Sequence, residues 1–214
     1  MTQSSVSAGA RPRTKQLTPR AQATREGILK AAERTFGRTS YEAASITDIV
    51  RRARVAQGTF YLYFPDKKSV FVELVRELGA QLRQALRAAT ADCTTRLDVE
   101  REGLRAFLHF SRDHRDLYRI VRQCEFVDAK AYRAYYQTLA DVYARGLEKA
   151  MTAKELRAGH PERIAYFLMG IADFSGMRWI LWDEGADLDA LVDEAIAFIR
   201  RGLEPQPTPK ERRR

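Results

Sequence analysis

The stretch from Ser45 to Tyr63 constrains the fold of this chain more than any other part of it. Ser45 and Asp48 have the spacing of a capping box, in which side chains satisfy the free backbone N–H groups at a helix start. Apolar residues at helical spacing follow, so the pattern predicts a short helix that ends near Arg54. The segment from Gln57 to Tyr63 predicts a second short helix. Two short helices joined by a tight turn are typical of a helix-turn-helix unit.

The rest of the chain also has the pattern of helices. Pro19 suits a first helical position, and apolar residues at intervals of four then predict a helix that ends near Gly37. Asp66 is the expected cap of a long helix that runs to about Ala91. Further helices are predicted at 97–112, 115–123, 128–151, 161–184 and 188–203. No alternating strand pattern is found, so the chain is expected to be all-α, with a three-helix head followed by a helical bundle.

Positive charge is concentrated at the start of the chain. Residues 1–68 hold 13 Lys and Arg against 5 Asp and Glu, whereas residues 69–209 hold 20 against 22. A basic first third on a near-neutral body favours a polyanion-binding head carried by a different kind of domain. A solvated basic surface explains the charge equally well, so charge alone leaves both interpretations open.

Several classes of site and location are disfavoured by the sequence. Cys93 and Cys124 match no metal or redox spacing, and the three histidines form no ligand pair. No catalytic triad, paired carboxylates or glycine-rich phosphate loop is found, so we expect neither an enzyme nor a metal or cofactor. The N-terminus has no apolar signal region, and the most apolar stretch, from Ile164 to Trp182, contains Asp173. We therefore expect a cytoplasmic protein without a membrane span.

The stretch from Arg25 to Phe71 resembles the DNA-binding region of the tetracycline-repressor (TetR) family of bacterial regulators. The matching residues are Phe36, Tyr41, Ser45, Asp48, Ile49, the run Gly58-Thr59-Phe60-Tyr61, Tyr63, Phe64 and Lys67. The chain departs from the family pattern at Ser40 and Arg54, where glycine is usual, and at Ala56, where serine often caps the second short helix. Arg54 is expected to need a left-handed backbone, which costs about 1 kcal/mol, and Ala56 forgoes a cap worth about 1 kcal/mol.

The resemblance and the side-chain chemistry together assign the expected DNA contacts. A helix start at Ser45 and Thr47 offers hydroxyl and N–H groups to phosphate, and the Gln57 amide suits adenine N6 and N7. Lys67 is expected to anchor a phosphate. The full set of expected contacts is Ser45, Thr47, Gln57, Gly58, Thr59, Tyr61, Tyr63 and Lys67. The neighbouring Phe60, Leu62 and Phe64 are expected to pack in the core.

The body is expected to bind a ligand and to form a dimer. In the family, the two C-terminal helices of each subunit form a four-helix bundle, which here implies a homodimer through 161–184 and 188–203; an ordinary monomer core is the alternative. The aromatic-rich middle helices are compatible with a mostly apolar cavity. Its expected ligand-binding residues are Phe107, Phe110, Tyr118, Arg122, Phe126, Tyr136, Phe167, Asp173 and Phe174. Asp173 is expected either to pair with an arginine such as Arg178 or to face the ligand.

Composition and the resemblance together imply four segments and a function. The expected segments are a disordered basic arm (1–17), a helix-turn-helix DNA-binding domain (18–65), a ligand-binding and dimerisation domain (66–204) and a flexible basic tail (205–214). We expect a repressor that is released from a palindromic double-stranded operator by a small effector. The effector is expected to be hydrophobic or acyl-type, with an aromatic cation as the alternative. An activator of the same family and an architectural protein that binds DNA without sequence preference also remain open.

Overall fold

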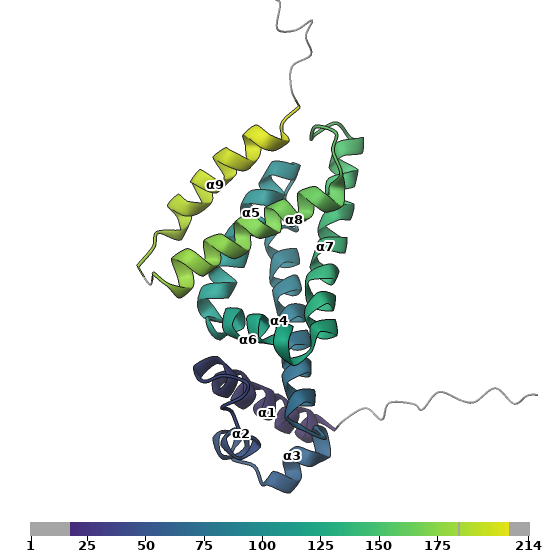
Figure 1. The fold of residues 1–214 in the computed structure, drawn as a ribbon. Coiled ribbons are helices and arrows are strands. Elements are labelled where there is room, and N and C mark those ends of the chain that lie inside the picture. The colour runs from purple at the N-terminus through teal and green to yellow at the C-terminus, as the bar shows by residue number, and fades with distance from the viewer. Residues whose placement is uncertain (1–17, 184, 206–214) are drawn as a thin grey trace, which may run out of the picture.

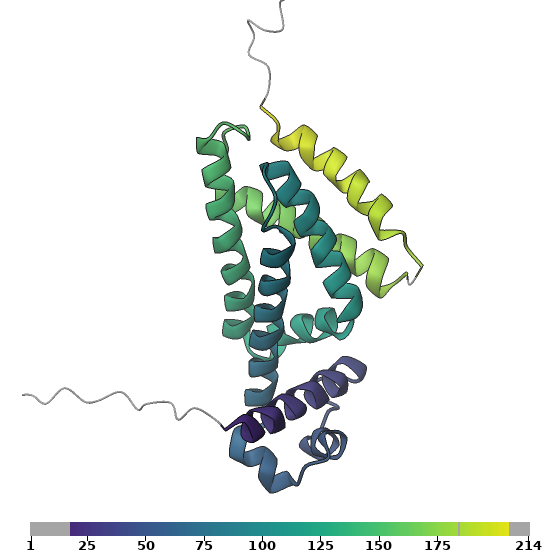
Figure 2. The same cartoon turned by 180° about the vertical axis from the view of Figure 1, so that it is seen from behind.

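A computed structural model describes residues 18–183 and 185–205, and regular structure within these ranges is entirely helical (Figure 1 and Figure 2). The all-α class predicted from the sequence is confirmed. The expected basic arm (1–17) lies outside the described residues, as does the expected tail apart from its first residue. The helices are α1 (Pro19–Arg38), α2 (Ile46–Ala53), α3 (Gln57–Tyr63), α4 (Lys67–Ala89), α5 (Arg96–Asp113), α6 (Asp116–Val127), α7 (Ala129–Thr152), α8 (Pro161–Gly176), the π-helical η1 (Met177–Leu181) and α9 (Leu188–Leu203).

Side-chain caps explain where the helices of the head begin. Ser45 Oγ accepts a hydrogen bond from the backbone N–H of Asp48, and Asp66 Oδ1 accepts one from Ser69 N–H at the start of α4. Arg54 has φ 57° and ψ 41°, so the left-handed turn expected from the sequence is confirmed. Ala56 provides no side-chain cap to α3, also as expected.

The head shares one apolar core with α6. Phe36, Ile49, Phe60 and Phe71, from α1 to α4, are buried in it together with Ile120 from α6. Figure 1 shows α6 lying across the top of α1, so the body contributes directly to the core of the head. The position and packing of the head helices α1, α2 and α3 therefore depend on α6 as well as on α4.

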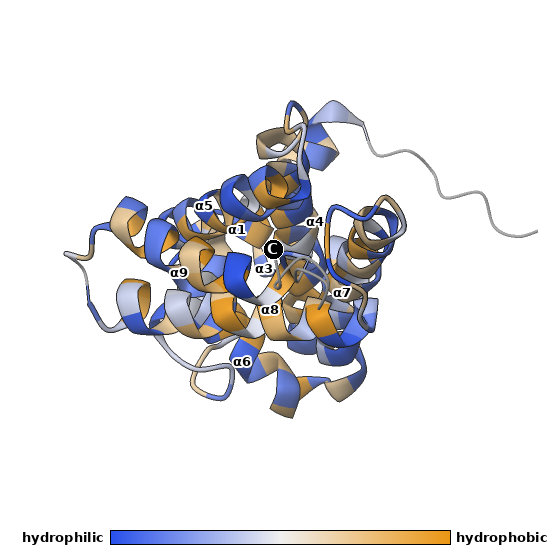
Figure 3. Cartoon of the chain, turned by 90° about the horizontal axis from the view of Figure 1, so that it is seen from above, coloured by the Kyte–Doolittle hydropathy of each residue, from blue (hydrophilic) through white to orange (hydrophobic). Residues whose placement is uncertain are grey.

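The second core lies between α5, α7, α8 and α9. Leu108, Leu147, Leu168 and Ile196 are among its buried residues. Viewed from above in Figure 3, hydrophobic residues gather where α4, α5, α7 and α8 face one another, and hydrophilic residues cover much of the outside. This arrangement holds the body together at the end of the molecule opposite α2 and α3 (Figure 1).

The predicted helix at 161–184 differs from the observed elements. α8 ends at Gly176 and continues as a π-helical segment to Leu181. The hydroxyl of Tyr118 lies so close to Gly176 that a Cβ at this position would stand 1.8 Å from it, so a larger residue does not fit at this junction. By length and composition alone, Pro161–Leu181 also resembles a membrane span, and in the structure α8 packs on α5 and α7.

Candidate functional site

The α3 helix lies at the end of the molecule, far from α8 and α9 (Figure 1). Gln57 and Gly58 are exposed at its start, Tyr61 is 49% exposed, and Thr59 is partly buried. Phe60 points the other way and is fully buried, which fixes the helix on the head core. The expected contact residues of α3 therefore lie on an accessible surface backed by a rigid support.

Leu62 of α3 and Phe64, which directly follows this helix, show how far the expected packing holds. Phe64 is buried, as the sequence predicted, but Leu62 is 82% exposed and the prediction that it packs in the core is wrong. Leu62 lies two positions from Phe60, which is close to the opposite side of a helix. Tyr63 is partly buried against the head core, so only part of its ring is accessible.

The start of α2 offers fewer free groups than expected. Thr47 is exposed, but the hydroxyl of Ser45 accepts from Asp48 N–H and donates to Asp48 Oδ2 at 2.6 Å. The Ser45 hydrogen bond is the first cause that lowers the pKa of Asp48. The Ser45 hydroxyl therefore already donates its proton to Asp48. The groups that remain at this helix start to bind a phosphate are chiefly backbone N–H groups.

Lys67 has a different role from the expected phosphate anchor. Its ammonium group donates to the carbonyl oxygens of Tyr41 (2.7 Å) and Ala44 (3.0 Å), with Glu42 O at 3.5 Å, and it lies 4.4 Å from the centre of the Tyr41 ring. An ammonium group has three N–H donors. All of them point to the loop between α1 and α2, so we correct the expected role: Lys67 holds this loop in place.

Sequence reasoning missed three arginines beside α3. Arg51, Arg52 and Arg54 are exposed on α2 and on the turn that follows it. Arg51 pairs with Asp48 at 2.6 Å, whereas the described residues contain no acidic partner for Arg52 or Arg54. The run of three arginines within four residues was a visible signal for a phosphate-binding edge.

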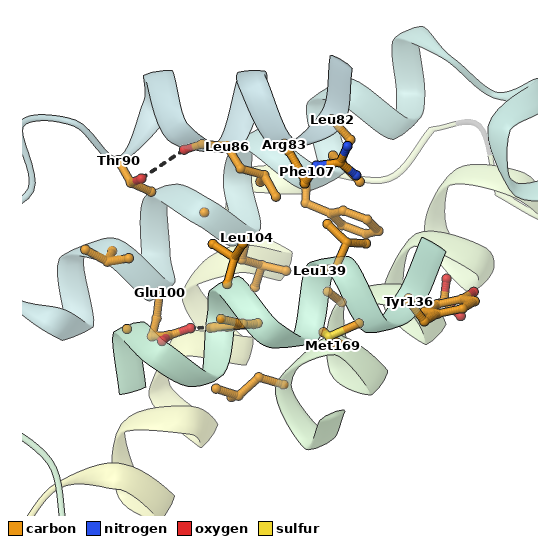
Figure 4. Close-up of a pocket in the computed structure, with 18 of the residues that line it drawn as sticks. Leu82, Arg83, Leu86, Thr90, Glu100, Leu104, Phe107, Tyr136, Leu139 and Met169 are labelled. Atoms are coloured by element: carbon orange, nitrogen blue, oxygen red, sulfur yellow. Dashed lines mark hydrogen bonds between the residues drawn. The ribbon is translucent and has the colours of Figure 1, made fainter. Parts of the chain in front are cut away.

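A cavity of about 400 Å³ lies in the body and is lined by residues of α4, α5, α6, α7, α8 and α9 (Figure 4). Most of its wall is apolar, with Leu82 and Leu86 from α4, Leu104 from α5, and Leu139 from α7. This volume is in the range of cavities that hold small molecules. Of the expected ligand-binding residues, the cavity brings together Phe107, Tyr118, Arg122, Tyr136 and Asp173.

Four expected ligand-binding residues do not line this cavity. Phe126, Phe167 and Phe174 are 89%, 69% and 65% exposed on the outside of α6 and α8. Phe110 belongs to the edge of the head core, where its ring stacks on His114 with the ring centres 4.4 Å apart. The aromatic residues of α8, which are Tyr166, Phe167 and Phe174, are all exposed, and their spacing alone did not indicate which side of the helix faces the cavity.

The end of the cavity nearest the head is polar. Burial is the main cause that raises the pKa values of the Tyr118, Tyr135 and Tyr136 hydroxyls, and the nearby Asp173 carboxylate raises each of them further. Burial also raises the pKa of Asp173, against the opposing charge of Arg122. The expected pairing of Asp173 with Arg178 is corrected, because Arg178 pairs with Asp183 at 3.6 Å.

The other end of the cavity contains a closed network. Glu100 is buried and accepts hydrogen bonds from the guanidinium of Arg96 and from the hydroxyl of Tyr143. Arg96 also lies over the Tyr143 ring, 5.3 Å from its centre. No sequence pattern connects these residues, which come from α5 and α7.

The α6 helix borders the cavity on one side and the head on the other. Tyr118 and Arg122 line the cavity. Arg119 Nη1 donates to the carbonyl of Gly37 at 3.0 Å, and the Gln123 amide accepts from Tyr41 N–H and donates to Phe36 O at 3.4 Å. A displacement of α6 by a ligand would therefore act directly on the end of α1.

Comparisons with known proteins agree with this architecture. The family model described as "Bacterial regulatory proteins, tetR family" matches residues 28–74. The HTH-type transcriptional repressor BepR of Brucella suis biovar 1 (strain 1330) is 33% identical over 191 residues, which is 84% of this chain and 91% of BepR. The fatty acid metabolism regulator protein of Bacillus subtilis (strain 168) is 24% identical, over 82% of this chain and 93% of its own.

Solved structures share the fold. The fatty acid degradation regulator FadR of Bacillus halodurans has a TM-score of 0.75 at 21% identity, over 86% of this chain and 96% of that one. FadR of Bacillus subtilis, solved in complex with stearoyl-CoA, has a TM-score of 0.74 at 19% identity, over 81% and 96% of the two chains. At this level of identity the likeness concerns the arrangement of the helices.

Proposed function

This chain belongs to the TetR family of bacterial regulatory proteins, and from that premise we propose that it is a repressor released from a palindromic operator by a hydrophobic effector. It is a ligand-responsive, DNA-binding regulator of transcription rather than an enzyme. The observation that carries the proposal is the combination of an exposed α3 helix and an apolar cavity. The α3 helix packs on the core that α6 shares with the head, and α6 also lines the cavity. The name of BepR favours repression over activation.

The proposed DNA contact places α3 in the major groove. The recognition surface, defined as Thr47, Gln57, Gly58, Thr59, Tyr61 and the accessible part of Tyr63, supports this docking because it contains hydrogen-bonding groups and lies next to exposed arginines. In this arrangement Gln57 contacts a base edge. The helix start at Ser45 and Thr47, together with Arg52 and Arg54, contacts phosphates.

The proposed homodimer forms through α8, η1 and α9. A single helix of seven residues contacts few bases, and helix-turn-helix proteins usually bind as two-fold dimers with half-sites about 34–36 Å apart. Phe167, Phe174 and Phe198 are exposed on α8 and α9, and Trp182 is exposed directly after η1. Both α8 and α9 pack on α5. An apolar surface of this kind favours a protein partner, and we propose a second copy of the chain.

The proposed effector is an acyl-type molecule that binds in the cavity. Its apolar wall and its volume suit a hydrocarbon chain, and the complex of Bacillus subtilis FadR with stearoyl-CoA supports this choice by analogy. Binding next to Tyr118 and Arg122 would favour a position of α6 that moves the heads out of register with the two half-sites. Such a regulator works on chromosomal DNA, so we place it in the cytoplasm.

Fluorescence anisotropy with a selected operator tests the proposal. We expect the operator to bind at least about a thousand times more tightly than random DNA at one fixed salt concentration. Dodecanoyl-CoA should weaken operator binding and raise the melting temperature of the protein in the absence of DNA. Equal affinity for operator and random DNA would favour an architectural protein. Tighter operator binding with the effector would contradict release.

A further inference from the structure

Two arginines of the cavity wall have no acidic partner. Arg83 and Arg87 lie one helical turn apart on α4, and both line the cavity, where Figure 4 labels Arg83. Arg83 is partly buried and Arg87 is exposed, so the pair leads from solvent into the wall. Within residues 18–183 and 185–205, no carboxylate forms an ion pair with either side chain. A partly buried cation without a partner is costly, so this placement indicates a missing anion.

The other charged groups of the cavity are already engaged. Arg96 is held by Glu100 at 2.6 Å, and Arg122 opposes the charge of Asp173 while its Nη1 contacts the sulfur of Met177. These two arginines therefore face the two acidic residues of the wall. Arg83 and Arg87 remain as the uncompensated positive charge of the cavity.

An apolar wall adjoins this positive charge. Leu82 and Leu86 stand next to the two arginines on α4, and Phe107 and Leu139 extend the apolar surface across the cavity (Figure 4). A molecule that complements both features has a hydrocarbon part and an anionic end. The planar guanidinium group pairs well with the two oxygens of a carboxylate or a phosphate.

We infer that Arg83 and Arg87 form a subsite for the oxyanion of an amphipathic effector, whose hydrocarbon part lies along Leu82, Leu86 and Phe107. This inference rests on the proposed effector-binding function and adds the charge of the ligand to it. A carboxylate and a phosphate have the same chemistry at this subsite. The test therefore compares both of them with a neutral molecule of equal chain length.

Calorimetry on the full-length protein measures the contribution of charge. We expect dodecanoate or dodecyl phosphate, below the concentration at which they form micelles, to bind at least about tenfold more tightly than 1-dodecanol. In Arg83→Gln/Arg87→Gln this preference should disappear, while the affinity for 1-dodecanol stays within about twofold. Arg83→Lys/Arg87→Lys keeps both positive charges and should retain most of the preference. Such retention would show that the loss in the glutamine variant comes from the missing charge and not from a folding defect.

A matched control comes from the same helix. Arg76 is exposed on α4, pairs with Glu73 and does not line the cavity, so Arg76→Gln should keep the full preference for the oxyanion. Equal affinities of the wild-type protein for dodecanoate, dodecyl phosphate and 1-dodecanol would overturn the inference. If all three ligands still released the protein from DNA in that case, the proposed function would stand and only the oxyanion subsite would be refuted.

Two other results would also overturn the inference. The first is preferred binding of dodecylammonium that is lost in Asp173→Asn, which would assign a cation to the polar end of the cavity. The second is a folded protein that binds none of the four amphiphiles, which would refute the hydrophobic effector of the proposed function as well.

Discussion

Lys67 is the residue whose role depends most on the fold. The carbonyl groups that its ammonium contacts belong to Tyr41 and Ala44, more than twenty positions earlier in the chain. A basic residue in the first turn of a helix is compatible with phosphate binding, and the sequence alone favoured that role. In the structure the charge instead holds the loop that leads into α2, so we expect Lys67 to affect DNA binding only indirectly.

Replacement of Lys67 tests this structural role. Lys67→Met should lower the free energy of unfolding by about 1.5–3 kcal/mol, because carbonyl groups of the loop lose a charged donor. Urea denaturation measures the change. Lys68→Met is the matched control: Lys68 is exposed, its partner is Asp128 at 3.0 Å, and its loss should cost less than about 1 kcal/mol. Unchanged stability in Lys67→Met, with weaker binding to every DNA sequence, would restore the phosphate anchor.

Gln57 is the residue expected to read a base. Gln57→Ala should reduce discrimination at one position of each half-site by about 1–3 kcal/mol and leave the affinity for random DNA nearly unchanged. Binding titrations with single-base operator variants measure this effect. A uniform loss across all sequences would instead assign Gln57 to the phosphates.

Arg54 combines backbone strain with a positive charge. Arg54→Gly should raise the stability of the protein by up to about 1 kcal/mol, because glycine adopts the left-handed conformation without a steric penalty. Loss of the cation should weaken binding to all DNA and reduce the salt dependence by about one charge. Chemical denaturation and salt titrations measure the two effects separately. A variant that is less stable than the wild type would contradict the account of this turn.

At the scale of elements, the sequence was most informative about helices and least informative about their neighbours. Caps such as Ser45 and Asp66 predicted helix starts that the structure confirms. The sequence predicted one long helix here, but it did not indicate that Leu82 and Leu86 line a cavity. Periodicity gives the apolar face of a helix, but it does not give the partner of that face.

The α6 helix is the element that links the cavity to the head. Gln123→Ala removes the side-chain contacts to Tyr41 N–H and Phe36 O and leaves Tyr118 and Arg122 in the cavity wall. We expect the affinity for dodecanoyl-CoA to stay within about twofold, while the coupling between effector and DNA binding, about 1–3 kcal/mol in typical cases, decreases. Anisotropy titrations with and without effector measure this coupling.

The control for α6 is Gln137→Ala. Gln137 lies on α7, and its amide donates a hydrogen bond to Asp141. Its replacement by alanine should leave the coupling unchanged. If Gln123→Ala kept the full coupling, transmission would have to run through α4 rather than through these contacts of α6.

At the scale of the whole molecule, the sequence predicted the division into head and body but not how they share a core. Ile120 of α6 is buried among residues of α1 to α4, and no local pattern connects them. The exposed aromatic residues of α8 were predicted to contact the ligand. Phe167 and Phe174 in fact face outwards, which fits the proposed dimer surface better. The aromatic residues of α8 are all exposed and the cavity is lined by its other residues, such as Leu168 and Met169, so an apolar side chain on this helix does not by itself distinguish a ligand contact from a subunit contact.

Disruption of the proposed dimer surface should abolish operator binding without unfolding the protein. Phe174→Glu/Phe198→Glu places two charges on exposed positions of α8 and α9, so we expect a folded monomer with operator affinity reduced to about the non-specific level. Sedimentation velocity and circular dichroism measure mass and fold. Phe126→Glu, at an equally exposed position on α6, is the control and should remain a dimer.

Selection of binding sites from random DNA tests whether two copies of α3 read the major groove as a symmetric pair. We expect enrichment of an inverted repeat whose half-sites lie about one helical turn, or a whole number of turns, apart. We also expect Gln57→Ala to relax the same position in both halves. Failure to enrich any sequence, or enrichment of a single asymmetric site that Gln57→Ala leaves unchanged, would contradict the symmetric pair.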